Sequence, residues 1–185
     1  MTARTTRVLG TLLIAMTAGS LLLVAMESEP PHMAATGAVI ARLQYNASNW
    51  TVSRPWQRIV VHASAGGPDR LPQRCHFIIH ASPSGNGWVT PTPLWDRQEP
   101  GQHVYVPGQN FNSDSIGICL VGDFKDHGPG EPQFAALMTL VHELQRRCDI
   151  PPECVYLNSE LNPDSASPGA AFPAATFNRH LYRPQ

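Results

Sequence analysis

The sequence lacks an excess of charge of either sign, and this limits the partners that it can attract. Charged residues make up 15% of the 185 residues, and 13 basic against 14 acidic side chains leave a formal net charge of −1. Nucleic acids and anionic lipid surfaces are attracted by clustered basic charge, which such a composition does not provide. We therefore expect no nucleic-acid partner.

Internal repeats and long low-complexity runs are also absent, so neither a repeat architecture nor a compositionally biased chain is indicated. The 18 prolines and 14 glycines favour a loop-rich domain over a helical bundle. Once the N-terminal segment is set aside, about 150 residues remain, which is enough for one domain with a hydrophobic core.

A long apolar run lies near the N-terminus. Arg4 and Arg7 precede the run from Val8 to Met26, which has 19 residues and no charge. It is longer than the ~7–15 residues of a signal-peptide core and close to the ~20 that span a bilayer as a helix. No A-x-A cleavage site follows it. Residues 1–26 are therefore predicted to be an uncleaved signal anchor, with a cleaved signal peptide as the alternative.

The arginines on the short side of this run predict a cytoplasmic N-terminus and an exported remainder. The chain is thus expected to be anchored in the inner membrane, with its domain outside the cytoplasm. Residues 27–36 are predicted to form a linker, because Pro30 and Pro31 cannot continue a helix. The domain is expected to occupy residues 37–185.

Export permits disulfides, and four cysteines are present. Cys148 and Cys154 flank five residues, so a local bridge between them is one alternative and two free thiols are the other. Cys119 lies within the apolar run from Ile116 to Val121. It is predicted to be a small buried hydrophobic residue.

Short β-branched runs separated by turn residues predict strands, and one longer periodic stretch predicts a helix. In that stretch Pro132 fits the first helical turn, and apolar residues recur at helical spacing. Strands that alternate with helical stretches indicate a single α/β domain with a central mixed β-sheet flanked by helices. The expected strands are residues 59–62, 75–80, 88–90, 115–121 and 155–157, and the expected helices are residues 131–148 and 174–181.

Four segments carry motifs that occur in the same order in one known family. They are WQRIVVHASA (56–65), HFII (76–79), GQH (101–103) leading to SIGICLVG (115–122), and IPP (150–152) leading through Glu160 to SPG (167–169) and FP (172–173). Together they resemble the type 2 N-acetylmuramoyl-L-alanine amidase and peptidoglycan recognition protein family over roughly residues 55–182. The resemblance implies the fold of that family. It also implies a substrate, the amide between the lactyl group of N-acetylmuramic acid and the L-alanine of the stem peptide.

The resemblance further implies a zinc ion, which lowers the pKa of a bound water and polarises the amide carbonyl. Three protein side chains hold a catalytic zinc. By the family motifs, the first ligand position falls on His62, the second on Asn158 and the third on Ser167. A neutral amide and a hydroxyl are not normal zinc ligands. Two of the three expected zinc ligands are therefore replaced, and no intact catalytic set is expected.

Two further positions are assigned by the resemblance. Cys75 stands where many relatives carry a tyrosine that faces the active site, and His103 stands in a motif position linked to muropeptide binding. With His62, Asn158 and Ser167, they are the predicted substrate-binding residues. Twelve residues separate His62 from Cys75. Relatives usually carry a helix there that walls the substrate groove, so a more open cleft is expected.

The first hypothesis for function is a domain that binds peptidoglycan or muropeptides, has lost catalysis and needs no cofactor. One alternative is an active zinc-dependent amidase with a rearranged metal site formed by His62, Cys75 and His103. Another is a structural or partner-binding module. If no metal binds, His62 is expected to be a hydrogen-bonded residue at a strand end, and Cys75 a small apolar replacement or a thiol activated by His62.

Overall fold

The structure is a computed structural model that describes residues 50–64, 74–81 and 87–184. Within these residues no helix combines the length and apolar character needed to cross a membrane. The predicted signal anchor (1–26) and linker (27–36) lie outside the described residues, as does most of the short stretch between His62 and Cys75.

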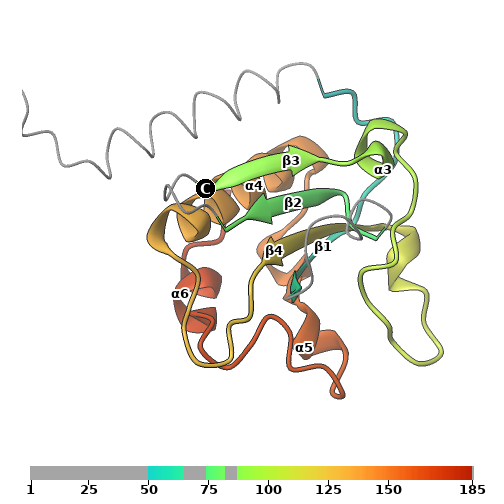
Figure 1. Ribbon diagram of the computed structural model, residues 1–185. Coiled ribbons are helices and arrows are strands. Elements are labelled where there is room, and N and C mark those ends of the chain that lie inside the picture. The colour runs from blue at the N-terminus through green and yellow to red at the C-terminus, as the bar shows by residue number, and fades with distance from the viewer. Residues whose placement is uncertain (1–49, 65–73, 82–86, 185) are drawn as a thin grey trace, which may run out of the picture. The chain divides into compact units, whose positions relative to one another are not determined.

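Five strands form one mixed sheet in the order β3-β2-β4-β1-β5 (Figure 1). Neighbouring strands are parallel except β3, which runs antiparallel to β2 at one edge. This confirms the central mixed sheet expected from the sequence. The strands are β1 (Arg58–Ser64), β2 (Phe77–His80), β3 (Trp88–Pro91), β4 (Ser115–Val121) and β5 (Val155–Leu157).

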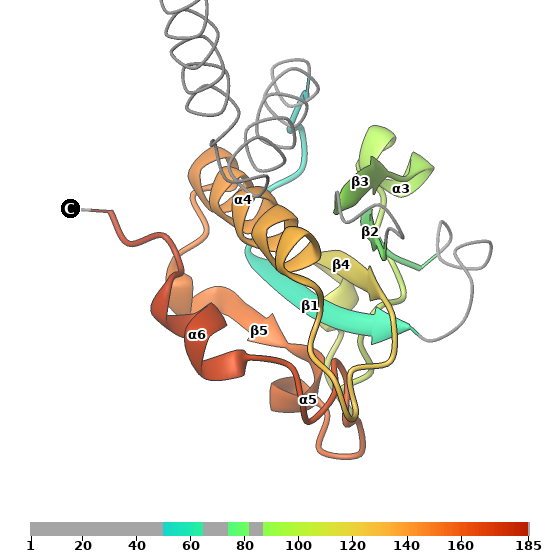
Figure 2. The same cartoon turned by 60° about the vertical axis from the view of Figure 1, so that its left-hand side comes forward.

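The long helix α4 (Glu131–Cys148) runs across one face of the sheet (Figure 2) and has the bounds predicted from its periodicity. Pro132 occupies its first turn, and Asp149 ends it in the left-handed conformation with φ 54°. Its buried Gln133 amide donates to the carbonyls of Ile79 and Val121, at the ends of β2 and β4. The apolar side chains that α4 buries are Ala136, Leu137, Leu140, Val141 and Leu144.

The strand residues alternate between the two faces of the sheet. Ile59, Val61 and Ile118 belong to the large core that includes the apolar side chains of α4. Cys75, Ile78 and Cys119 form a separate small cluster. Because strand neighbours alternate in direction, this second cluster lies on the face of the sheet opposite α4.

The other helices are short. The last one, α6 (Ala174–Arg179), ends two residues before the predicted boundary at Leu181, because the backbone amide of His180 closes the final turn. Single-turn elements were not expected from the sequence, since one turn is too short to show a hydrophobic period. They are α3 (Pro93–Asp96), η2 (Phe111–Ser113), η3 (Pro152–Cys154) and α5 (Asn158–Leu161).

The predicted strand 75–80 was too long by two residues, because β2 begins at Phe77. Cys75 precedes it, and its carbonyl accepts a hydrogen bond from the Thr92 hydroxyl, 2.7 Å away, rather than from a strand. The backbone amide of His76 donates to the carbonyl of Gly117 in β4. This bond holds Cys75 beside the sheet.

Candidate functional site

Strand register brings two chemically active side chains together on the face opposite α4. In the parallel pair β1–β4, His62 lies directly opposite Cys119, and in the pair β2–β4 the same cysteine lies opposite Ile78. Directly opposed residues of neighbouring strands project to the same face. His62 and Cys119 therefore emerge side by side, and Cys75 approaches them from the segment before β2.

The potential ligand atoms of His62, Cys75 and Cys119 all lie within 4.8 Å of one another. Both cysteines are fully buried. His62 is half-buried, but its Nε2 atom is buried, and no described residue forms a hydrogen bond with it. Cys119 was expected only to be a small buried hydrophobic residue; it is buried, and it also contributes its sulfur to this group. The sequence carried no signal for this contribution, because it depends on the register in which β1 and β4 pair.

The two thiols differ in acidity. A hydrogen bond from Cys119 is the main reason that the pKa of Cys75 falls to about 6, and the His62 imidazole lowers this pKa further, while burial opposes the shift. The pKa of Cys119 is raised by its bond to Cys75 and by burial. The surroundings therefore favour loss of the proton from Cys75 over loss of the proton from Cys119. A thiolate beside an imidazole can bind a soft metal or act as a nucleophile.

Asn158, which the resemblance assigns to the second ligand position, begins α5 directly after β5. Its side chain is buried, and its Nδ2 donates a 2.9 Å hydrogen bond to the backbone carbonyl of His103. The neighbouring Glu160 carboxylate accepts a bond from the amide of Leu157. Asn158 thus connects the start of α5 to the loop before β4.

Ser167, at the third ligand position, lies beside the end of β1. Its Oγ accepts a 2.8 Å hydrogen bond from the backbone amide of Ala63, the residue after His62. The backbone carbonyl of Ser167 accepts another bond, from the amide of Ser159. The fold therefore brings Ser167 to the backbone of β1 at the residue after His62, and its hydroxyl forms a structural hydrogen bond there.

His103 is buried and lies against β4, where its Nε2 is 2.7 Å from the Ser115 hydroxyl. Burial lowers its pKa well below the ordinary value, with smaller contributions from His76 and His62. Its ligand atoms are not part of the group formed by His62 and the cysteines. The structure therefore differs from the set expected for a rearranged metal site, because Cys119 takes the place assigned to His103.

His76 is a fully buried packing residue with both ring nitrogens bonded. Its Nδ1 accepts from the backbone amide of Gly117 at 2.9 Å, and its Nε2 donates to the carbonyl of Glu99 at 2.9 Å. Burial lowers its pKa to about 4, and the nearby Arg54 charge adds to this effect. The side chain is therefore neutral in the folded domain at neutral pH.

Lowering the pH from 7 to 5 is expected to reduce the free energy of unfolding by about 2 kcal/mol through His76 alone, and His103 adds to the loss. An unfolded histidine protonates near pH 6.5, whereas folded His76 stays neutral to about pH 4. The unfolded state therefore binds more protons between these values, and stability present above pH 6.5 falls as the pH drops.

Urea unfolding at the two pH values, with EDTA in the buffer to remove metal effects, measures this loss. The variant His76→Gln, whose amide can donate and accept but does not titrate in this range, should show a smaller dependence on pH. Equal stability of the original chain at pH 7 and pH 5 would contradict the expectation.

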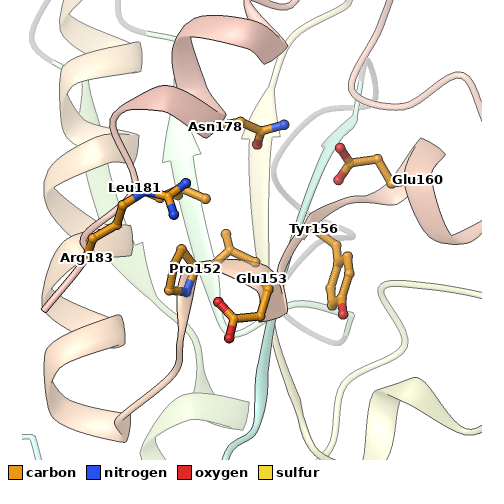
Figure 3. A pocket seen from close by; sticks show the side chains of 8 residues that line it. Pro152, Glu153, Tyr156, Glu160, Asn178, Leu181 and Arg183 are labelled. Carbon is orange, nitrogen blue, oxygen red and sulfur yellow. The ribbon is translucent and has the colours of Figure 1, made fainter.

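A cavity of about 420 Å³ lies at the β5 edge of the sheet (Figure 3). The polar side chains that line it include those of Glu153, Tyr156, Glu160 and Arg183. None of the five predicted substrate-binding residues lines this cavity. It is therefore separate from the His62 group, and we assign it no part in the family chemistry.

The sequence and the fold of this chain were compared with known proteins and solved structures. The sequence profile of the N-acetylmuramoyl-L-alanine amidase family matches residues 52–169. Among curated proteins, no sequence gives a significant match.

Several solved structures share the fold at low sequence identity. An endolysin amidase from Clostridium intestinale is 18% identical, with a TM-score of 0.55 over 68% of this chain and 83% of that chain. The amidase AmiD from E. coli, solved with anhydro-N-acetylmuramic acid-L-Ala-D-γ-Glu-L-Lys, is 21% identical, with a TM-score of 0.58 over 70% and 59%. AmpDh3 from Pseudomonas aeruginosa, solved with an anhydromuramic pentapeptide, is 19% identical, with a TM-score of 0.58 over 70% and 62%.

The profile match spans all five strands of the described residues, and the solved structures have the same fold. The chain therefore belongs to the N-acetylmuramoyl-L-alanine amidase family.

Proposed function

We propose that this domain binds peptidoglycan through its muropeptide units and does not carry out the zinc-dependent hydrolysis typical of the family. The observation that carries the proposal is that the side chains of Asn158 and Ser167 form hydrogen bonds within the protein. Each occupies a family ligand position, and each forms a hydrogen bond to backbone, with His103 and Ala63 respectively.

The chemistry of these positions does not fit the zinc ion of the family site. Zinc is held by thiolate, imidazole or carboxylate groups, which carry charge or a strong lone pair. The amide nitrogen of Asn158 is a donor, and the Ser167 oxygen already accepts a bond from the amide of Ala63. At these positions only His62 could be a ligand, and one imidazole does not retain zinc against water. We therefore derive no catalytic step from the family metal.

Support for ligand binding comes from the fold. In open sheets with parallel strands, ligands bind beyond the carboxyl ends of the strands. His62 lies near that end of β1, and Asn158 directly follows β5. Ser167 meets the same edge beside Ala63. Two solved proteins of this fold carry muropeptides, and in this chain we place the same class of ligand at this edge.

The proposal includes the location of the protein. We place the domain outside the cytoplasm, where peptidoglycan is found, and assign the anchoring to residues 1–26. The support is the apolar run with its preceding arginines.

The full chain, purified in mild detergent, is expected to sediment with purified sacculi and to release no stem peptide from them. EDTA should be present, so that no metal contributes to binding. A soluble muropeptide should compete, and His62→Gln should weaken retention roughly tenfold, the loss expected for about 1.4 kcal/mol.

The matched control is His180→Gln, because His180 is an exposed histidine at the end of α6 and is not one of the five predicted substrate-binding residues. It should bind sacculi like the original chain. Failure of the original chain to sediment would contradict the binding proposal. Zinc-dependent release of stem peptides, measured without EDTA, would contradict the loss of hydrolysis.

A further inference from the structure

His62, Cys75 and Cys119 form a group of which the proposed peptidoglycan binding uses only His62. The group combines one imidazole and two sulfurs from three separate segments: β1, β4 and the residues before β2. We propose that these three side chains bind one Zn²⁺ ion. This site shares only His62 with the family ligand positions, and its other two ligands come from elsewhere on the sheet.

The spacing of the group suits a tetrahedral ion. Zinc binds thiolate sulfur at about 2.3 Å and imidazole nitrogen at about 2.0–2.1 Å, so two ligand atoms of one tetrahedral ion lie roughly 3.5–3.8 Å apart. All three ligand atoms here lie within 4.8 Å of one another. This spread is close to that of a bound set, so binding would require only a small approach of the three side chains.

The donor set selects a soft divalent ion and balances its charge. Thiolate and imidazole ligands favour zinc over magnesium or calcium, which prefer oxygen. Binding would release the thiol protons to solvent. Two thiolates and one neutral imidazole around Zn²⁺ then give a centre with no net charge, and burial of such a centre avoids the cost of an unpaired buried charge.

An unsatisfied polar atom points to the same conclusion. The Nε2 atom of His62 is buried, and no described residue forms a hydrogen bond with it. Leaving a buried polar atom without a hydrogen-bond partner costs free energy of folding. A metal ion that binds the atom is one explanation for such an arrangement. Coordination by His62 together with the fully buried Cys75 and Cys119 would remove that cost.

The location of the ligands assigns the ion a role in stability. It would join β1 to β4 and would hold both to the segment before β2, so binding adds to the stability of the folded state. Three protein ligands leave one coordination position for a water molecule. Because both cysteines are fully buried, we infer stabilisation of the sheet rather than contact with a cell-wall polymer.

The test uses the full chain, purified in mild detergent with a phosphine reductant and no chelator. After incubation with ZnCl₂ and exhaustive dialysis, elemental analysis should find about one zinc per chain. Replacement by Co²⁺ should produce the sulfur-to-cobalt charge-transfer absorption and the intense visible bands of a tetrahedral site. Cys75→Ser and Cys119→Ser should each weaken zinc binding by at least about 100-fold, a loss no smaller than that from altered supporting residues.

Two variants serve as matched controls. Cys148→Ser replaces a half-buried thiol outside the group, and Ser167→Ala alters a family ligand position; both should retain zinc. The cobalt spectrum needs no variant, so the proposal stays testable if a ligand variant does not fold. Less than about 0.1 zinc per chain, with both thiols reduced, would overturn it, as would a cobalt spectrum without sulfur coordination. Sacculus binding in EDTA is measured separately, so failure of one proposal leaves the other standing.

Discussion

Replacing Gly117 by alanine is expected to lower the free energy of unfolding by about 3 kcal/mol, the upper part of the usual range for an overpacked core. Gly117 lies in the middle of β4, and the ring of His103 covers it. A Cβ atom at this position would lie 2.3 Å from Cγ of His103 and 2.5 Å from its Nδ1. The ring cannot remain there, and its bond to Ser115 would be lost.

Chemical unfolding at pH 7 in EDTA measures this loss. Gly130→Ala is the matched control, because the nearest atom to its Cβ, in Pro132, is 3.9 Å away. Gly130 is the N-cap of α4 and alanine is a poorer cap, so its effect should be no more than about 1 kcal/mol. If the clash with the His103 ring causes the loss, the double variant Gly117→Ala/His103→Ala should lose less free energy of unfolding than the sum of the two single losses. The difference should be at least about 1 kcal/mol. Additive losses would contradict the steric explanation.

Replacing Trp95 by alanine is expected to cost about 3–5 kcal/mol, the range for removing a buried large aromatic side chain. Trp95 lies in α3 and is among the largest fully buried side chains. Its ring is 4.7 Å from that of Phe77 in β2 and 5.3 Å from that of Trp50. The substitution removes both contacts and leaves a cavity beside β2.

The loss can be measured by the shift of the urea midpoint, followed by circular dichroism because tryptophan fluorescence itself changes. Tyr105→Ala is the control, since this aromatic side chain is 71% exposed and its removal should change stability by no more than about 0.5 kcal/mol. A cost for Trp95→Ala as small as that for Tyr105→Ala would show that the cluster contributes little.

The parts of the fold that were predicted correctly have strong local signals. The residues of β4 are almost all apolar, and α4 shows an apolar period over 18 residues with proline in its first turn. Such segments form the same element in most contexts, because a buried strand and an amphipathic helix each match one period. Errors fell on boundaries, as at Cys75, and on single-turn helices such as α3.

For the candidate site, local motifs indicated which residues matter, and the tertiary structure showed which atoms they contact. The family motifs located His62, Asn158 and Ser167, and the structure does bring Ser167 beside β1. The sequence did not indicate that Asn158 would bond to the backbone of His103, 55 residues away. Such a contact depends on how distant segments pack, which no local pattern encodes.

From the sequence by itself came the family, the mixed sheet and the long helix, because each depends on residue identity or on a local period. Only the tertiary structure decided which side chains meet. Cys119 joins His62 because two parallel strands pair in one register, and a shift by a single residue would turn it to the other face of the sheet. The His103 ring packs on Gly117, and its ligand atoms are not part of that group.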